Sequence, residues 1–255
     1  MKKNEAYARV ALVTGATSGI GEATARRFVA AGFGVVGSGR NAVRLEQLEA
    51  ELGKAFKGVS GDMAQAGVVD KLFVATFERF GKVPDIVVAN AGRGLGGSVK
   101  EADLSQFESM LRVNVSSTLE LLQRAAREML PQQAVGYPDT AADIVVVGSV
   151  VGRHISPFSA VYGSTKFAVH ALAEGLRREL GPKGVRVTLV EPGITISGFQ
   201  EAAGYSADMV HNFEDKFGPL LVAEDVADAI QYVVSLPPHV HVSDIVVRPT
   251  RQDYP

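Results

Sequence analysis

Short apolar segments alternate with longer amphipathic segments along the whole of this 255-residue chain. Most of the short segments are apolar without a break rather than at every second position, as strands buried on both faces are. We therefore expect strands at Val10–Thr14, Gly34–Ser38, Phe56–Val59, Asp85–Ala89, Asp143–Gly148, Val185–Val190 and Asp244–Val247.

The longer segments between these strands repeat their apolar residues with the period of a helix. A strand followed by a helix, repeated many times, predicts a parallel sheet with right-handed crossovers and helices on both faces. The predicted fold is an α/β, doubly wound parallel sheet. Its expected helices are Ala23–Ala31, Val43–Leu52, Val68–Phe80, Leu104–Leu130, Ala160–Leu180 and Ala223–Ser235.

No shift in composition and no flexible linker divides the chain, which predicts a single domain over residues 1–255. Two segments interrupt the alternation. Gln132–Ala142 is polar and contains proline, so we expect a loop without a function of its own. Ser197–Pro219 contains glycines and aromatic residues and follows a strand. Long insertions of this kind are often active-site lids, although plain packing is an alternative.

Composition narrows the function classes. The chain has no cysteine, which excludes disulfides, thiolate metal sites and cysteine nucleophiles. Its net charge of −2 gives no indication of a nucleic-acid or membrane partner. No apolar run approaches the roughly 20 residues that span a bilayer, and the first residues do not resemble a signal peptide. We therefore expect a soluble cytoplasmic protein.

A glycine-rich turn follows the first predicted strand, in Thr14-Gly15-Ala16-Thr17-Ser18-Gly19-Ile20-Gly21, and a helix is expected directly after it. Glycines permit a tight turn and a close approach of the backbone to a pyrophosphate, which free N–H groups at the helix start would bind. An ordinary turn is the alternative, but the strand–turn–helix context favours a dinucleotide. The expected contacts are Gly15, Thr17, Ser18, Gly19, Ile20 and Gly21.

The residues after the second strand distinguish the two nicotinamide dinucleotides. NAD-binding units carry a carboxylate there for the ribose 2′-hydroxyl, whereas this chain has Arg40 and Asn41. A guanidinium suits a 2′-phosphate. A solvated arginine is the alternative, and a cation at a helix start is mildly unfavourable. The sequence thus favours NADP(H).

Two further segments lie where the cofactor would pass. Asp62, followed by Met63 after the third strand, is positioned either to accept from the adenine amino group or to cap the next helix. Asn90-Ala91-Gly92, after the fourth strand, places small residues beside the cofactor path.

Tyr162 and Lys166 are four residues apart in a predicted helix and therefore lie on one face, one turn apart. The unperturbed pKa of tyrosine is about 10, and a nearby ammonium would lower it toward neutrality, as an acid/base catalyst requires. Alone, such a pair is usually a helix surface. Ser149 ends the fifth strand, at the sheet edge where such folds bind ligands, and could hold a substrate oxygen.

Together, the motifs resemble the short-chain dehydrogenase/reductase family over essentially the whole chain. The match rests on Thr14–Gly21, Asn90-Ala91-Gly92, Asn114, Ser149, Tyr162 with Lys166, and Pro192-Gly193. The resemblance implies a Rossmann-type sheet, with Tyr162 as acid/base, Ser149 orienting the carbonyl and Lys166 lowering the tyrosine pKa and binding the ribose. It also implies that Asn114 holds a water that links Lys166 to solvent, and that Pro192, Gly193, Ile194 and Thr195 contact the nicotinamide carboxamide.

The last residues, Ile245–Gln252, resemble the NADP-dependent serine and 3-hydroxy acid dehydrogenases, whereas many family members end in an aspartate–glycine turn. The resemblance therefore implies an NADP(H)-dependent oxidoreductase acting on a small carbonyl or alcohol compound, with 3-hydroxy acids as the specific expectation. It also implies a homotetramer or dimer. The alternatives are a broad carbonyl or 3-oxoacyl reductase, and a non-catalytic NADP(H) sensor.

Several other residues carry no assignment. His239 and His241 lie on a proline-containing loop without a third ligand, so we expect no metal site. Arg93 and Arg153 follow Gly92 and Ser149 and could bind a substrate carboxylate, although surface arginines are commoner.

Overall fold

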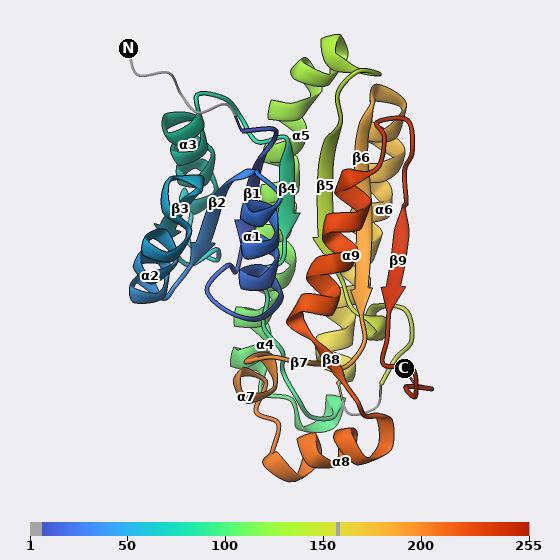
Figure 1. The fold of residues 1–255 in the computed structure, drawn as a ribbon. Coiled ribbons are helices and arrows are strands. Elements are labelled where there is room, and N and C mark those ends of the chain that lie inside the picture. Colours follow the sequence, from blue (N-terminus) through green and yellow to red (C-terminus); the bar gives the residue numbers. More distant parts are fainter. Residues whose placement is uncertain (1–6, 157–158, 255) are drawn as a thin grey trace.

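The computed structural model describes residues 7–156 and 159–254. One parallel sheet of seven strands organises this part of the chain (Figure 1). In the order of the sheet the strands are β3 (Phe56–Ser60), β2 (Gly34–Gly39), β1 (Val10–Thr14), β4 (Ile86–Ala89), β5 (Ala142–Val147), β6 (Val185–Pro192) and β9 (Asp244–Val247).

The strands in the middle of the sheet are covered on both faces. Every residue of β1, β4, β5 and β6 is buried, which explains why these segments are apolar without alternation. All strand pairs are parallel, and each predicted strand is present within about two residues of its expected bounds. The predicted doubly wound fold is confirmed.

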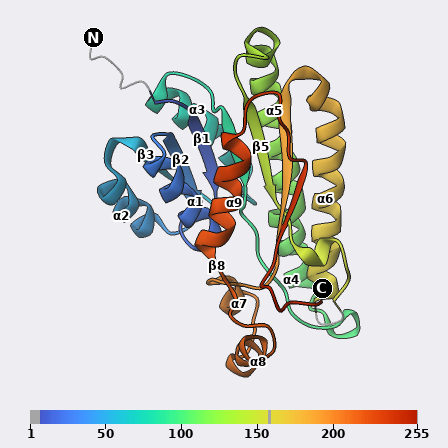
Figure 2. The ribbon, with the colours of Figure 1, turned by 45° about the vertical axis from the view of Figure 1, so that its right-hand side comes forward.

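Helices form a layer on each side of the sheet (Figures 1 and 2). One face is packed by α1 (Gly19–Ala30), α2 (Ala42–Leu52) and α9 (Ala223–Ser235), the other by α3 (Val68–Phe80), α5 (Ser117–Gly136) and α6 (Ala160–Leu180). None of the helices in residues 7–156 and 159–254 combines the length and the apolar character needed to cross a bilayer. Short 3-10 turns lie at Gly53–Ala55, Val99–Glu101, Val150–Gly152 and Gly181–Lys183.

The predicted helix Leu104–Leu130 differs from the observed structure in two ways. It is divided into α4 (Leu104–Leu111) and α5 by a π-helical turn over Arg112–Ser116. It also continues through Pro131 to Gly136, so most of the predicted loop Gln132–Ala142 is helix or turn. The buried side chain of Gln133 donates to the carbonyl oxygen of Thr140 at 2.6 Å, which anchors this last turn.

The segment after β6 leaves the sheet. It contains β7 (Thr195–Ile196), α7 (Phe199–Ala202) and α8 (Ala207–Phe217), and it returns through β8 (Leu221–Val222), which pairs with β7. Figures 1 and 2 show α7 and α8 projecting beyond the ends of the strands. The predicted lid segment Ser197–Pro219 is therefore a helical excursion that begins and ends at one small two-stranded ladder.

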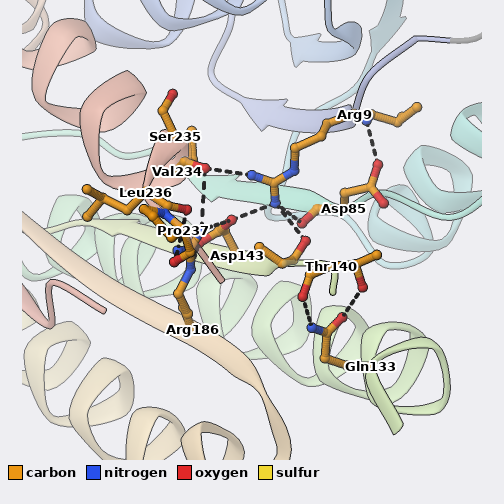
Figure 3. Close-up of polar contacts among 12 residues, drawn as sticks. Arg9, Asp85, Gln133, Thr140, Asp143, Arg186, Val234, Ser235, Leu236 and Pro237 are labelled. Carbon is orange, nitrogen blue, oxygen red and sulfur yellow. Dashed lines mark hydrogen bonds and ion pairs between the residues drawn. The ribbon is translucent and has the colours of Figure 1, made fainter. Parts of the chain in front are cut away.

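The opposite edge of the sheet holds a buried cluster of charges (Figure 3). Arg186 donates to both oxygens of Asp143, at 2.7 and 2.9 Å, and Arg9 donates to the same carboxylate. Arg186 also donates to the carbonyls of Leu236, Pro237 and Val240, while Arg9 donates to that of Val234 at 2.7 Å. The cluster thus ties the starts of β1, β5 and β6 to the end of α9.

Candidate active site

A cavity of about 750 Å³ opens at the carboxyl edge of the sheet, between the strand ends and the α7–α8 excursion. Most residues expected to bind the cofactor or to act in catalysis lie in its wall. These are Gly15, Thr17, Ser18, Gly19, Ile20, Arg40, Asp62, Met63, Asn90, Ala91, Gly92, Ser149, Tyr162, Lys166, Pro192, Gly193, Ile194 and Thr195. Gly21, Asn41 and Asn114 belong to the same region but not to the wall.

The glycine-rich turn has the backbone that its sequence predicts. Gly15 and Gly19 have φ of +70° and +51°, which only glycine adopts readily. Ser18 is the N-cap of α1, and its side chain makes no capping hydrogen bond, so N–H groups of the first turn remain available to an anion. Gly21 does not line the cavity. A Cβ there would lie 2.2 Å from the Gly15 carbonyl oxygen, so this glycine permits close packing of helix and turn.

Asn90 and Ala91 are attached to this turn. The Thr14 hydroxyl accepts from the backbone N–H of both residues at 3.0 Å, and the Asn90 amide donates to the Thr14 carbonyl at 2.9 Å. The end of β4 is thereby fixed against the end of β1, and both form one side of the cavity.

Arg40 and Arg44 show how differently neighbouring cations are used. Arg44 donates to Glu22 and to Glu51. Arg40 is exposed at the cavity, and no residue in the described ranges pairs with its side chain. Asn41 instead caps α2, its side chain accepting from Arg44 N–H at 3.0 Å. A guanidinium with free donors is thus available to an anion at this end of the cavity.

Asp62 lies in the cavity wall, and one of its carboxylate oxygens is already hydrogen-bonded within the protein. Its Oδ1 accepts from the N–H of Ala64 at 2.9 Å, which closes a turn. The alternative in which Asp62 caps the following helix is wrong, because the N-cap of α3 is Gly67. The second oxygen of Asp62 remains for a ligand. Met63 is buried next to it and accepts a weak hydrogen bond from Ser38.

Tyr162 and Ser149 meet inside the cavity. Tyr162 is on the first turn of α6 and is 8% exposed, and its phenol is hydrogen-bonded to the Ser149 side chain. Burial raises the pKa of Tyr162 and the nearby Tyr205 raises it further, while the Ser149 hydrogen bond lowers it. This direction is opposite to the lowered pKa expected from the Tyr162–Lys166 spacing, because removing the phenolate from water outweighs the hydrogen bond from Ser149.

Lys166 lies one turn further along α6, buried against the end of β5. Its ammonium donates to the Val147 carbonyl at 2.8 Å and lies 5.8 Å from the centre of the Tyr162 ring. Burial lowers the pKa of Lys166 to about 8. The ammonium of Lys166 therefore lies between the end of β5 and the Tyr162 ring, and it has further N–H donors available to a ligand.

Asn114 lies behind the cavity in the π-helical turn, a feature frequent at functional sites. Its amide nitrogen donates to the Arg93 carbonyl at 2.9 Å and to the Thr165 hydroxyl at 3.0 Å, and its oxygen accepts from Arg93 N–H at 2.9 Å. Asn114 thus connects the loop after β4 to α6, next to Lys166.

The loop Pro192–Thr195 is held by the C-terminal tail, a contact that the sequence did not predict. Gly193 N–H donates to the Val247 carbonyl at 2.7 Å, and Ile194 N–H donates to the side chain of Gln252 at 2.9 Å. Gln252 is 5% exposed and lines the cavity. No local pattern marks such a residue, because its partner is 58 positions away.

A second group missed from the sequence lies behind Ser149. His170 Nε2 accepts from the N–H of Ser149 at 3.3 Å, and its Nδ1 lies 3.7 Å from the carboxylate of Glu191. Glu191 is fully buried and also accepts two bonds from Arg153. Burial lowers the pKa of His170, which favours the neutral ring that accepts from Ser149.

Metal ligands are not assembled around this site. Within the described residues there is no group of three or more His, Asp or Glu side chains that could hold an ion. His241, one of the two histidines considered above, bonds to the Val187 carbonyl at 2.9 Å instead.

The α7–α8 excursion forms the remaining wall of the cavity. The sequence predicted a possible lid over Ser197–Pro219 but not which of its side chains would face the cavity. Phe199, Tyr205, Phe213 and Phe217 all line the cavity, and we call these four residues the aromatic wall. Gly96 N–H donates to the Ala203 carbonyl at 3.2 Å, so the loop after β4 holds α7 in place.

Comparison with known proteins gives consistent results. A family model described as short chain dehydrogenase matches residues 9–206. A serine 3-dehydrogenase of Agrobacterium fabrum is 34% identical over 245 residues, which cover 95% of this chain and 94% of that protein.

Solved structures are similar along the full length. A closed form of serine dehydrogenase complexed with NADP⁺ has a TM-score of 0.85 and 30% identity, with 96% of each chain covered. A 3-ketoacyl-(acyl-carrier-protein) reductase from Brucella melitensis complexed with NADH has a TM-score of 0.87 and 28% identity. That similarity covers 96% of this chain and 98% of the reductase.

Proposed function

This chain belongs to the short-chain dehydrogenase family, and from that premise we propose an NADP(H)-dependent enzyme that interconverts a carbonyl compound and its alcohol at Tyr162. An oxidoreductase of CH–OH groups using a nicotinamide cofactor is common to the family and its relatives. The observation that carries the proposal is the convergence of Tyr162, Ser149 and Lys166 on a cavity that begins at the glycine-rich turn.

The residues present fit a dinucleotide with a 2′-phosphate. The turn at Gly15 and Gly19 directs helix N–H groups into the cavity, where a pyrophosphate would be bound. Arg40, which has no partner among the described residues, would bind the 2′-phosphate, which favours NADP(H) over NAD(H). Asp62 would accept from the adenine, and Asn90, Ala91 and Gly92 would border the path to the nicotinamide.

Tyr162 and Ser149 would bind the substrate oxygen, and Tyr162 would exchange a proton with it. The bound cofactor supplies or accepts the hydride. Tyr162 donates its proton to the carbonyl oxygen in the reduction, and burial, by raising its pKa, keeps that proton in place until transfer. Ser149, hydrogen-bonded to the phenol, holds the same oxygen. In the oxidation Tyr162 receives the proton.

Lys166 and Asn114 would support the tyrosine. The ammonium of Lys166 stabilises the phenolate left after proton transfer, and its remaining donors suit a ribose hydroxyl. Asn114 fixes the turn next to Lys166, and its amide oxygen retains one lone pair for a water molecule. Pro192, Gly193, Ile194 and Thr195 would contact the carboxamide, supported from behind by Gln252.

Other parts of the proposal concern the whole molecule. The excursion over residues 197–219 would act as a substrate lid on a single 1–255 domain, since its aromatic wall covers the reacting groups. We also include a homotetramer, or a dimer, and a cytoplasmic location, which the family resemblance and the absence of cysteine favour. Light scattering on the purified protein tests the assembly.

Deuteride transfer tests the proposed reaction. The enzyme is incubated with each epimer of 4-deuterated NADPH and a panel of ketones, oxo acids and 3-oxoacyl compounds, and mass spectrometry follows deuterium on the carbinol carbon. In the reverse direction, serine and other 3-hydroxy acids are supplied with NADP⁺. We expect transfer from one epimer only, with NADH much poorer than NADPH. Cofactor binding without transfer to any substrate would contradict the proposal.

A further inference from the structure

The aromatic wall starts at the reacting tyrosine and continues away from it. The ring of Phe199 lies 5.3 Å from that of Tyr162, centre to centre, and Tyr205 follows at 6.4 Å from Phe199. Phe213 lies 6.2 Å from Tyr205, and Phe217 lies 6.4 Å from Phe213. Because each ring also lines the cavity, a substituent on the reacting carbonyl would meet aromatic surface from the first atoms outward.

The surroundings of this wall are apolar as well. Leu95 comes from the loop after β4, Val150 and Val151 from the turn after β5, and Met209 from α8, and all line the cavity. Burial raises the pKa of Tyr205, as it raises that of Tyr162. A carboxylate placed here without a cationic partner would carry the same desolvation cost.

The cations near the site are already engaged or remote. Arg153 is paired with Glu191 and is not in the cavity wall. Arg93 lines the cavity, but its guanidinium donates to Gln106 and Ser109 on α4. A substrate carboxylate close to the carbonyl would therefore have to break those bonds to recruit Arg93.

Lys216 is the cation at the other end of the wall. It is exposed, and its ammonium lies 4.7 Å from the centre of the Phe217 ring. Phe217 is the last of the four rings, whereas Phe199 is the one that contacts Tyr162. Lys216 therefore suits an anion at the end of a long substrate rather than one beside the carbonyl.

We propose that the substrate of this site is a ketone or secondary alcohol with an extended apolar or aromatic substituent that lies along the aromatic wall. The proposal rests on the proposed function and decides between the two substrate classes that the relatives' names suggest. It places the chain on the side of acyl-like or aryl substrates. It disfavours serine, in which the carbon next to the reacting one carries both a carboxylate and an ammonium.

A homologous series of methyl ketones, from butanone to 2-decanone, tests the proposal through kcat/KM with NADPH. Each methylene buried on the wall should raise kcat/KM about fourfold until the wall is covered. Serine and 3-hydroxypropanoate with NADP⁺ should be far poorer than 2-octanol. If kcat/KM does not depend on chain length and serine is the preferred substrate, the proposed substrate class is overturned and the hydride-transfer function is left intact.

Variants identify the surface responsible for the dependence of kcat/KM on chain length. Phe213→Ala should reduce the gain per methylene to about twofold or less, so that kcat/KM falls much more for 2-decanone than for butanone. Met209→Ala, which removes a smaller group from the same helix, should give a weaker reduction. Phe77→Ala is the matched control, because Phe77 is 58% exposed on α3 and does not line the cavity. Equal slopes in wild type and Phe213→Ala would contradict the assignment to the wall.

A binding measurement separates this proposal from the proposed function. The ketones are titrated into the NADPH-loaded Tyr162→Phe variant while nicotinamide fluorescence is followed. Tighter binding with chain length that Phe213→Ala abolishes supports the apolar site even if no compound is turned over. Affinity independent of chain length would overturn it.

Discussion

The two edges of the central sheet are built from the same strands but use polar residues in opposite ways. At the amino edge, Asp143 at the start of β5 and Arg186 at the start of β6 form a buried pair that Arg9 completes. At the carboxyl edge, β5 leads into Ser149 and β6 ends at Pro192, where the cavity opens. Figure 3 shows the charged cluster at the amino edge.

The difference lies in whether the charged side chains are paired within the protein. Arg186 directs all its donors to Asp143 and to backbone carbonyls around the end of α9. None of these donors is left for a ligand. Arg40 at the other edge has no partner among the described residues. The paired charges at the amino edge hold the strands in register, whereas the unpaired guanidinium at the carboxyl edge is available to a ligand. Variants at the two edges should therefore separate stability from activity.

The largest expected effect on stability is at the amino edge. Asp143→Asn leaves Arg9 and Arg186 without a counter-charge in a buried site, and breaking a buried pair in this way costs about 3–5 kcal/mol of unfolding free energy. Urea unfolding measures the loss, while kcat/KM below the transition should stay within about twofold. Asp70→Asn, which breaks the exposed pair with Arg124, is the control and should cost less than about 1 kcal/mol. A similar loss in both variants would contradict the comparison.

Arg40→Leu should produce the reverse result. Removing the unpartnered guanidinium should raise the KM for NADPH about 10–100-fold, leave that for NADH nearly unchanged, and hardly alter stability. Arg44→Leu is the matched control, since Arg44 already donates to Glu22 and Glu51. It should reduce stability without changing the preference between cofactors. A large KM effect from Arg44 alone would place the 2′-phosphate elsewhere.

Lys166 should make stability depend on pH. Burial lowers its pKa to about 8 in the folded state, against about 10.4 in the unfolded chain. Between pH 8 and 10 the unfolded state therefore binds more protons, and the unfolding free energy should rise with pH by up to about 1.4 kcal/mol per unit. Tyr162, whose pKa is raised, opposes this only above about pH 10.

Urea unfolding of wild type and Lys166→Met over that range isolates the effect. The difference in unfolding free energy should shift in favour of the wild type as pH increases. Parallel pH profiles would show that the ammonium is not buried at neutral pH.

The smallest predicted effect concerns His170. His170→Asn removes the acceptor for the Ser149 N–H, and the loss of one hydrogen bond should reduce kcat about 2–10-fold. The KM for NADPH should remain unchanged, because the glycine-rich turn and Arg40 are untouched. An unchanged kcat would show that the turn after β5 holds Ser149 without this contact.

Sequence periodicity predicted the sheet and most helices because these elements depend on local, repeated burial. The bounds of β1, α3, α6 and α9 agree with the expected ones to the residue. The continuation of α5 through Pro131 was missed, since it depends on the contact between Gln133 and Thr140. Proline is a local signal against a helix interior, but here the helix continues to Gly136 and Gln133 is bonded to Thr140, seven positions along the chain.

The site follows the same rule. The turn at Gly15–Gly21 and the Tyr162–Lys166 pair are local motifs, and the sequence located them. Gln252 and His170 act through contacts with Ile194 and Ser149 that are 58 and 21 positions away. The raised pKa of Tyr162 likewise depends on burial by α7, which no spacing along α6 reveals.

The measurement that tests the central claim most directly is the kinetics and stability of Tyr162→Phe, taken on the same preparation. If the carboxyl edge carries the chemistry through this phenol, NADPH oxidation with the best ketone should fall about 10²–10⁴-fold. NADPH affinity should stay within a few-fold, and the melting temperature should fall by no more than a few degrees, because the substitution removes one hydroxyl and its hydrogen bond to Ser149. A variant that retains the wild-type rate within a few-fold would contradict the assignment of Tyr162 as the acid/base.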